Sequence, residues 1–191
     1  MSNRHKTLRQ LIARSRGVKD ANEFFQFELE DLSALGESAR SLMSEVPPAF
    51  GACVMLSSSW AGYLRERHGI PAIAVAGDVR IEGSRIFKYK QRLPEAGAKG
   101  KVVRKVWSGH CWIEVNGFLG DISIFRTAYA IDRPSVLKEF VLRHFGPGRG
   151  AFVSRVDDLP PGMQYTPKEV LNDRQVDMFI RSLGWQLENG I

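Results

Sequence analysis

Cysteine is scarce in this chain: Cys53 and Cys111 are the two among 191 residues. Two cysteines make no disulfide framework. No apolar run approaches the roughly eighteen residues needed to cross a bilayer, and the basic N-terminal segment lacks the apolar stretch and cleavage site of a signal peptide. We therefore expect a cytoplasmic protein in which both thiols are free.

Motifs for metal and phosphate binding are lacking as well. No cluster of His, Cys and Asp residues has metal-ligand spacing. The glycine-rich stretch at 146–150 lacks the Lys-Ser/Thr pair of a P-loop. We expect neither a metal nor a cofactor.

Charge is distributed unevenly. The 27 basic and 21 acidic residues give a net charge of +6, and the segment from Arg80 to Lys105 holds nine basic residues against Glu82 and Glu95. A solvated face explains this segment most simply, and the functional alternative is a surface that attracts an acidic protein or nucleic-acid partner. No zinc-finger, RNA-recognition or helix-turn-helix signature predicts specific nucleic-acid binding.

The order of elements indicates an α+β fold. The length suits one domain with a substantial core. Apolar periodicity predicts helices over 5–16, 20–46, 53–67, 134–145 and 167–183. Short apolar or alternating segments predict strands over 72–81, 85–91, 102–115, 118–125 and 151–156, with a turn at Gly83-Ser84. We expect helices packed on an antiparallel sheet, with N-terminal helices in 1–48, a core in 49–126, and C-terminal helices and a strand in 127–191.

The Asn-Gly pair at 116–117 is a strong hairpin signal, and it defines the strand register. A two-residue turn pairs 113 with 120 and 112 with 121. Side chains alternate along a strand, so His110, Trp112 and Asp121 share one face. Cys111 points to the other face and is expected in the core. His110 and Asp121 are diagonal neighbours, about 7–8 Å apart at the backbone, so the carboxylate can bond one ring nitrogen and leave the other for a nucleophile.

Cys53 opens the helix predicted over 53–67. A helix N-terminus carries free N–H groups and partial positive charge, and both of them, like a nearby imidazolium, lower the pKa of a thiol. The same N–H groups can hold the oxyanion that forms when a thiolate attacks a carbonyl. These residues predict a triad in which Cys53 is the nucleophile, His110 the base and Asp121 the residue that orients His110.

Three further residues are expected to contact the substrate. Gly51 and Ala52 precede the nucleophile and are small, which lets a substrate approach the backbone. Trp112 shares the face of His110 and is placed to wall the cleft, although an aromatic core role fits the sequence equally well.

The segments GACVMLSSSWAGYLRERHGIPAIAVAG and GHCWIEVNGFLGDISIF resemble the transglutaminase-like branch of the papain-fold thiol enzymes. In that family a Cys opens a helix that ends in an RxxGIPA-like stretch, a strand with His-x-Trp-x-x-Val follows, and an Asp lies on the next strand. The matching positions are Cys53, 67–72, His110 with Trp112 and Val115, and Asp121. The resemblance covers roughly residues 49–126 and implies a papain-like core, a helix packed on an antiparallel sheet with the triad between them.

This superfamily includes peptidases, peptide-maturation proteases, deamidases, transamidating enzymes and amine acetyltransferases. The resemblance therefore implies a cysteine hydrolase or acyltransferase that acts on an amide or related acyl bond of a peptide or protein. Two features depart from it. The stretch 46–50 lacks the Gln that papain-type enzymes use as an oxyanion donor, and the Arg-Gly-Gly-x-Cys motif of arylamine acetyltransferases is absent.

Two alternatives to this enzyme stay open. The first is a non-catalytic binding module that holds an acidic partner through the basic segment 80–105, with Cys53 and His110 as structural residues. The second is a redox pair of Cys53 and Cys111, which the opposite facing of Cys111 disfavours.

Overall fold

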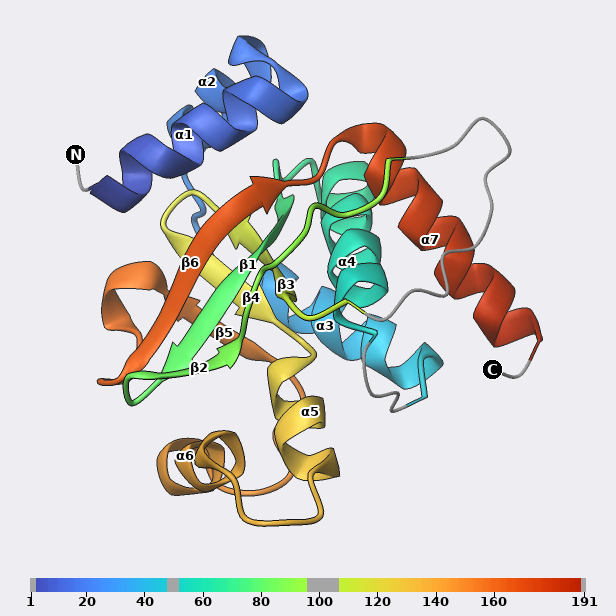
Figure 1. Ribbon diagram of the computed structural model, residues 1–191. Helices are drawn as coiled ribbons and strands as arrows, with labels where there is room; N and C mark the ends of the chain where they lie inside the picture. Colours follow the sequence, from blue (N-terminus) through green and yellow to red (C-terminus); the bar gives the residue numbers. More distant parts are fainter. Residues whose placement is uncertain (1–2, 48–51, 96–106, 190–191) are drawn as a thin grey trace.

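The computed structural model describes residues 3–47, 52–95 and 107–189. Within these residues the fold is α+β, with seven α-helices, one short 3₁₀ helix and a six-stranded antiparallel sheet. Helices cover both faces of the sheet (Figure 1). None of the described helices is long and apolar enough to cross a membrane.

Each element has well-defined bounds. The helices are α1 (Asn3–Arg16), α2 (Val18–Gln26), α3 (Ser33–Glu45), α4 (Cys53–His68), α5 (Ile124–Ala130), α6 (Val136–Phe145), η1 (Val156–Asp158) and α7 (Asp173–Glu188). The strands are β1 (Ile73–Ile81), β2 (Ser84–Phe87), β3 (His110–Val115), β4 (Phe118–Asp121), β5 (Phe152–Arg155) and β6 (Met163–Val170).

β1 organises the sheet. One edge of β1 pairs with β6, and the other edge pairs with β3 over residues 73–77 and with β2 over residues 79–81. β3 continues to β4, and β4 to β5. Two strands therefore share one edge of β1 and meet beside Gly77, where a side chain is excluded because a Cβ would lie 2.1 Å from the Thr166 carbonyl oxygen.

The hairpin register expected from Asn116-Gly117 is confirmed. Ile113 pairs with Gly120 and Val115 with Phe118. Gly117 has a φ of 81°, in the left-handed region that glycine adopts without strain.

The core has two parts, one on each face of the sheet. One cluster joins α3, α4 and α7 to inward-facing residues such as Cys111 and Ile113. The other joins α1, α2, α5 and α6 to residues such as Trp112 and Leu119. The alternation along β3 thus sends successive side chains into two different cores, as a strand with both faces covered requires.

Several predicted boundaries are wrong, and each has a local cause. The helix predicted over 20–46 is interrupted after Gln26, because Phe27 is extended and the Asn116 side chain bonds the carbonyl oxygens of Phe25 and Phe27. The strand predicted over 118–125 ends at Asp121, whose carboxylate accepts the backbone N–H groups that start α5. The turn at Gly83-Ser84 lies one residue earlier, since Ile81 pairs with Ser84.

The helix predicted over 167–183 is also wrong at its start. Residues 163–170 form β6, with alternate side chains buried, and α7 begins only after Asn172. The Asn172 side chain accepts from the Gln175 N–H, and Gln175 bonds back to Asn172 in a capping box. Residues 102–106, predicted as part of a strand, lie outside the described residues.

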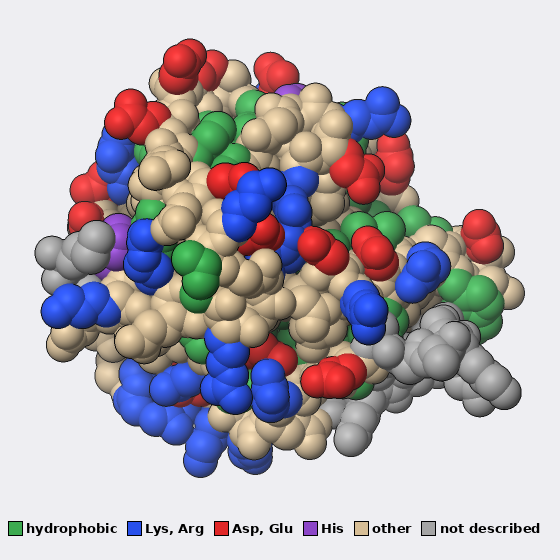
Figure 2. Space-filling model, turned by 90° about the horizontal axis from the view of Figure 1, so that it is seen from above, with side chains coloured by type: hydrophobic (Ala, Val, Ile, Leu, Met, Phe, Trp, Pro, Cys, Tyr) green, Lys and Arg blue, Asp and Glu red, His purple; other side chains and the backbone are tan. Residues whose placement is uncertain are grey.

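The surface carries both signs of charge. In the view of Figure 2, Asp and Glu side chains are spread over much of the face, whereas Lys and Arg side chains gather at its lower left.

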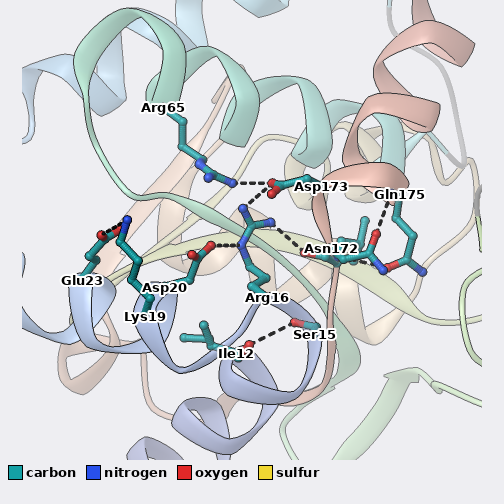
Figure 3. A network of polar contacts seen from close by, with 11 residues as sticks. Ile12, Ser15, Arg16, Lys19, Asp20, Glu23, Arg65, Asn172, Asp173 and Gln175 are labelled. Carbon is teal, nitrogen blue, oxygen red and sulfur yellow. Dashed lines mark hydrogen bonds and ion pairs between the residues drawn. The ribbon is translucent and has the colours of Figure 1, made fainter.

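Arg16 fastens the N-terminal helices to the rest of the molecule (Figure 3). Its side chain is 2% exposed, and it bonds the Leu171 carbonyl oxygen at 3.1 Å together with Asp20 and Asp173. Arg65 of α4 reaches the same Asp173 at 2.8 Å. The start of α7 is thereby connected to both α1 and α4.

Substitutions at two glycines test how closely the helices pack on the sheet. A Cβ at Gly120 would lie 2.5 Å from the Trp60 ring of α4, whereas one at Gly184 in α7 would meet no atom within 4 Å. We expect Gly120→Ala to lower the free energy of unfolding by about 1–3 kcal/mol through overpacking. Gly184→Ala should raise it by about 0.5–1 kcal/mol, because alanine favours the helix. Urea unfolding measures both, and a neutral effect at Gly120 would contradict the packing described here.

Candidate active site

Cys53 is the first residue of α4, as the sequence predicts. Ala52 precedes it as the N-cap residue and is buried, and Gly51 lies outside the described residues. The Cys53 thiol is free and half-buried. The first N–H groups of an α-helix have no partner within the helix, so α4 directs hydrogen-bond donors and partial positive charge toward this residue.

His110 and Asp121 form a buried pair. His110 Nε2 lies 2.6 Å from Asp121 Oδ2, and the two side chains are 1% and 0% exposed. The juxtaposition worked out from the hairpin register is therefore confirmed. Because Nε2 is taken by the carboxylate, Nδ1 is the nitrogen left for Cys53.

The pair is held in its charged form. Burial alone would lower the pKa of His110, but the Asp121 charge, the hydrogen bond to Asp121 and the contact with Cys53 outweigh burial and raise the pKa to about 10. Burial would likewise raise the pKa of the Asp121 carboxyl, but His110 and the hydrogen bonds from Ser123 and Tyr165 hold it below its ordinary value. An imidazolium facing a carboxylate is thus the favoured state.

Asp121 is satisfied on both oxygens. Oδ1 accepts from the Ser123 N–H at 2.9 Å, the Ser123 hydroxyl at 3.0 Å and the Ile124 N–H at 2.9 Å. Oδ2 accepts from His110 and, at 2.9 Å, from the Tyr165 hydroxyl. These donors compensate for the cost of burying the carboxylate and fix its orientation.

The thiol meets the imidazole at the end of β3. α4 packs on the face that carries Cys111, whereas the His110 ring contacts Phe87 and Tyr165 of the other cluster. Since His110 is the first residue of its strand, its ring stands at the sheet end, where the interaction with Cys53 adds to the effect of Asp121 in raising the pKa of His110. The three triad residues predicted from the sequence are therefore brought together.

Two aromatic residues complete the surroundings of His110, and neither was predicted. The Phe87 ring stacks on the imidazole with centroids 4.4 Å apart, and the Tyr165 hydroxyl bonds Asp121. Phe87 lies in a predicted strand, but the sequence gave no sign of its contact with His110. The alternation at 163–170 is a strand signal that could have placed Tyr165, had Pro167 not been interpreted as the start of a helix.

The expected substrate contact of Trp112 is wrong. Trp112 is 0% exposed, its ring packs edge-on to Tyr165, and its indole N–H donates to Glu114 at 2.9 Å. Glu114 in turn holds Arg4 of α1 through two hydrogen bonds. Trp112 is a core residue because both faces of β3 are covered by helices.

Cys111 is a core residue, as predicted. Its side chain is fully buried, and burial raises the pKa of its thiol well above the ordinary value, although a hydrogen bond with Ser57 opposes this. A neutral thiol enclosed in this way is a poor nucleophile.

The basic segment 80–105 is described only as far as residue 95. Lys99, Lys101, Arg104 and Lys105 lie outside the described residues. Among the residues that the structure describes, no group of three or more His, Cys, Asp or Glu side chains could hold a metal ion.

No protein-family model matches the chain, and no curated protein or solved structure matches it significantly. The arrangement of the site is therefore the basis on which a function can be proposed.

The Tyr165 hydroxyl provides a sharp test of the buried carboxylate. We expect Tyr165→Phe to lower the free energy of unfolding by about 1–3 kcal/mol, because Asp121 loses a donor that water cannot replace. Tyr63→Phe is the matched control, since Tyr63 is 41% exposed. Equal stability of the two variants in urea unfolding would contradict the described role of Tyr165.

The buried pair also predicts a pH dependence of stability. The pKa of His110 rises from 6.5 in the unfolded chain to about 10 in the folded state, so its stabilising contribution is complete below pH 6.5 and disappears as the pH rises toward 10. The depressed pKa of Asp121 makes its contribution complete above its ordinary value of 3.8 and lost in more acid solution.

Wild type should therefore exceed His110→Gln in free energy of unfolding by the largest margin between these limits, at about pH 5–6, by about 2 kcal/mol or more. The margin should narrow steadily between pH 6.5 and 10. Urea unfolding of both proteins across this range measures it, and a margin that grows with pH would show that the His110 ring is not stabilised as a cation.

Proposed function

We propose that this chain is a thiol enzyme that acts on an amide or related acyl bond through Cys53, His110 and Asp121. The observation that carries the proposal is the buried His110–Asp121 pair, 2.6 Å apart, in contact with a cysteine that opens a helix. Each group alone is common in proteins, whereas the three together form the arrangement that nucleophilic catalysis by a thiol requires.

The proposed reaction has two stages. The Cys53 thiolate bonds to the acyl carbon, and N–H groups at the start of α4 stabilise the negative oxygen. The intermediate then collapses: the carbon–nitrogen bond breaks, His110 gives its proton to the leaving amine, and a thioester remains on Cys53. Water or an amine, deprotonated by His110, attacks the thioester and releases the thiolate. Water gives hydrolysis or deamidation, and an amine gives transamidation.

Asp121 orients His110 and stays ionised throughout. Its bond to Nε2 keeps Nδ1 directed at Cys53 and stabilises the imidazolium that accompanies the thiolate. The backbone donors on Oδ1 hold the carboxylate in place from α5.

The resemblance to the transglutaminase-like branch of papain-fold enzymes supports the same function. Its motif positions at Cys53, His110 and Asp121 coincide with the residues that meet in space. A helix that opens on the nucleophile and packs on an antiparallel sheet is also the core that this family implies. We therefore propose a papain-like core and a peptide or protein substrate.

The first test measures the reactivity of the Cys53 thiol toward iodoacetamide. An unassisted thiol with a pKa of about 8.5 is ionised to less than about 1% at pH 6. We expect rapid alkylation of Cys53 at this pH, and His110→Ala should slow it about tenfold to hundredfold by removing the imidazolium. Mass spectrometry of proteolytic fragments distinguishes Cys53 from the buried Cys111.

His68→Ala is the matched control, because His68 lies at the other end of α4. This variant should alkylate like wild type. A slow reaction of wild type at pH 6 that His110→Ala leaves unchanged would reject the triad.

A further inference from the structure

The segment that follows β2 wraps around the sheet end where Cys53 and His110 meet. Phe87 stacks on the His110 ring. Two residues later, Tyr89 packs against the cluster on the other face, to which Cys53 belongs. This one stretch of chain thus contacts the His110 ring directly and also packs on the core beneath Cys53, and the exposed Lys88 lies between these two aromatic residues.

Buried carboxylates hold this segment in place. Asp78 accepts the Tyr89 N–H at 2.7 Å, and Glu169 accepts the Tyr89 hydroxyl at 2.7 Å and the Leu93 N–H at 3.0 Å. The Lys88 N–H also donates to the Ser108 carbonyl oxygen at 3.1 Å. The backbone that carries the lysines is therefore attached to β1, to β6 and to the residues just before β3.

The exposed side chains of this segment are mostly cationic. We call Arg85, Lys88, Lys90 and Arg92 the basic strip; all four are exposed. Arg92 lies 3.8 Å from Glu169, and within the described residues the other three have no ion-pair partner. The nearby Glu82 is paired with Arg143 of α6.

We propose that the basic strip binds an acidic segment of a polypeptide substrate and delivers its acyl group to Cys53. This rests on the proposed function. A thiol that attacks amide or related acyl bonds acts on a polypeptide rather than on a nucleic acid. Lys88 and Lys90 are two residues apart, about 7 Å in an extended chain, and alternate acidic side chains of an extended peptide repeat at the same spacing. Such charge pairing outside the reacting centre accelerates association and selects the partner.

The test uses fluorescein-labelled peptides of alternating Glu and Gly and of alternating Lys and Gly, and a labelled oligo(dT) of equal length. Fluorescence anisotropy measures binding to the full chain. The acidic peptide should bind, the basic one should not, and binding should weaken between about 50 and 300 mM salt as screening increases. Bound acidic peptide should also slow the alkylation of Cys53 by iodoacetamide, an uncharged reagent.

Lys88→Glu with Lys90→Glu should weaken binding of the acidic peptide about tenfold or more. The matched control is Lys6→Glu with Arg14→Glu, two exposed basic residues of α1, which changes the net charge equally and should leave binding intact. The proposal would be overturned if Lys88→Glu with Lys90→Glu left the affinity for the acidic peptide unchanged. It would also be overturned if oligo(dT) bound as tightly as the acidic peptide.

The two proposals fail in different ways. Alkylation without peptide, compared between wild type and His110→Ala, tests the triad alone. If alkylation is rapid and depends on His110 but the acidic peptide does not bind, the proposal for the basic strip is rejected and the proposal for the triad is retained. If the acidic peptide binds but alkylation is slow and independent of His110, the proposal that the strip delivers a substrate to a reactive thiol is rejected. The basic strip is then a docking surface on a protein without this catalysis.

Discussion

The rest of the site depends on one buried charge. Asp121 is an ionised carboxylate with no exposure, and such a group persists in a protein interior only when donors surround it. Those donors come from three places: His110 on β3, the backbone at the start of α5, and Tyr165 on β6. One carboxylate thus fixes the tautomer and tilt of the imidazole, ends β4, and ties a distant strand to the site. Substituting it would disturb structure and chemistry together.

The position of the Cys53 thiol depends on the pairing of two strands, β2 and β3, with one edge of β1. Because β2 and β3 pair with successive halves of the same edge, the sheet has an internal end at His110, between its two helical layers. α4 brings Cys53 to this end from one face, and the imidazole reaches it from the other. A helix N-terminus and a strand end can then meet although their side chains belong to different cores. Phe87 at the end of β2 stacks on the His110 ring, so the lysines that follow it lie next in sequence to a residue that contacts the proposed base.

Local chemistry made much of this predictable. An Asn-Gly turn admits few geometries, so the register of β3 and β4, and with it the His110–Asp121 pair, could be worked out by counting. Gly69, in the left-handed conformation (φ 64°), ends α4 close to the predicted boundary at residue 67. The errors arose where a distant group competes for the backbone. The Asn116 side chain donates to carbonyl oxygens at the end of α2. Pairing with β1 makes residues 163–170 a strand despite Pro167. Trp112 was misjudged because its sequence neighbours do not reveal that helices cover both faces of β3.

By itself, the sequence determined the α+β class, the helix that opens on Cys53, and the alternation that puts His110 and Asp121 on one face while sending Cys111 to the other. Each of these depends on interactions between residues close along the chain, where periodicity and turn chemistry are sufficient. Only the tertiary structure decided that Tyr165 and Phe87 contact the imidazole and that Trp112 is buried in the core. Those contacts join residues as much as 55 positions apart, from His110 to Tyr165, and strand order and packing, rather than local propensity, bring them together.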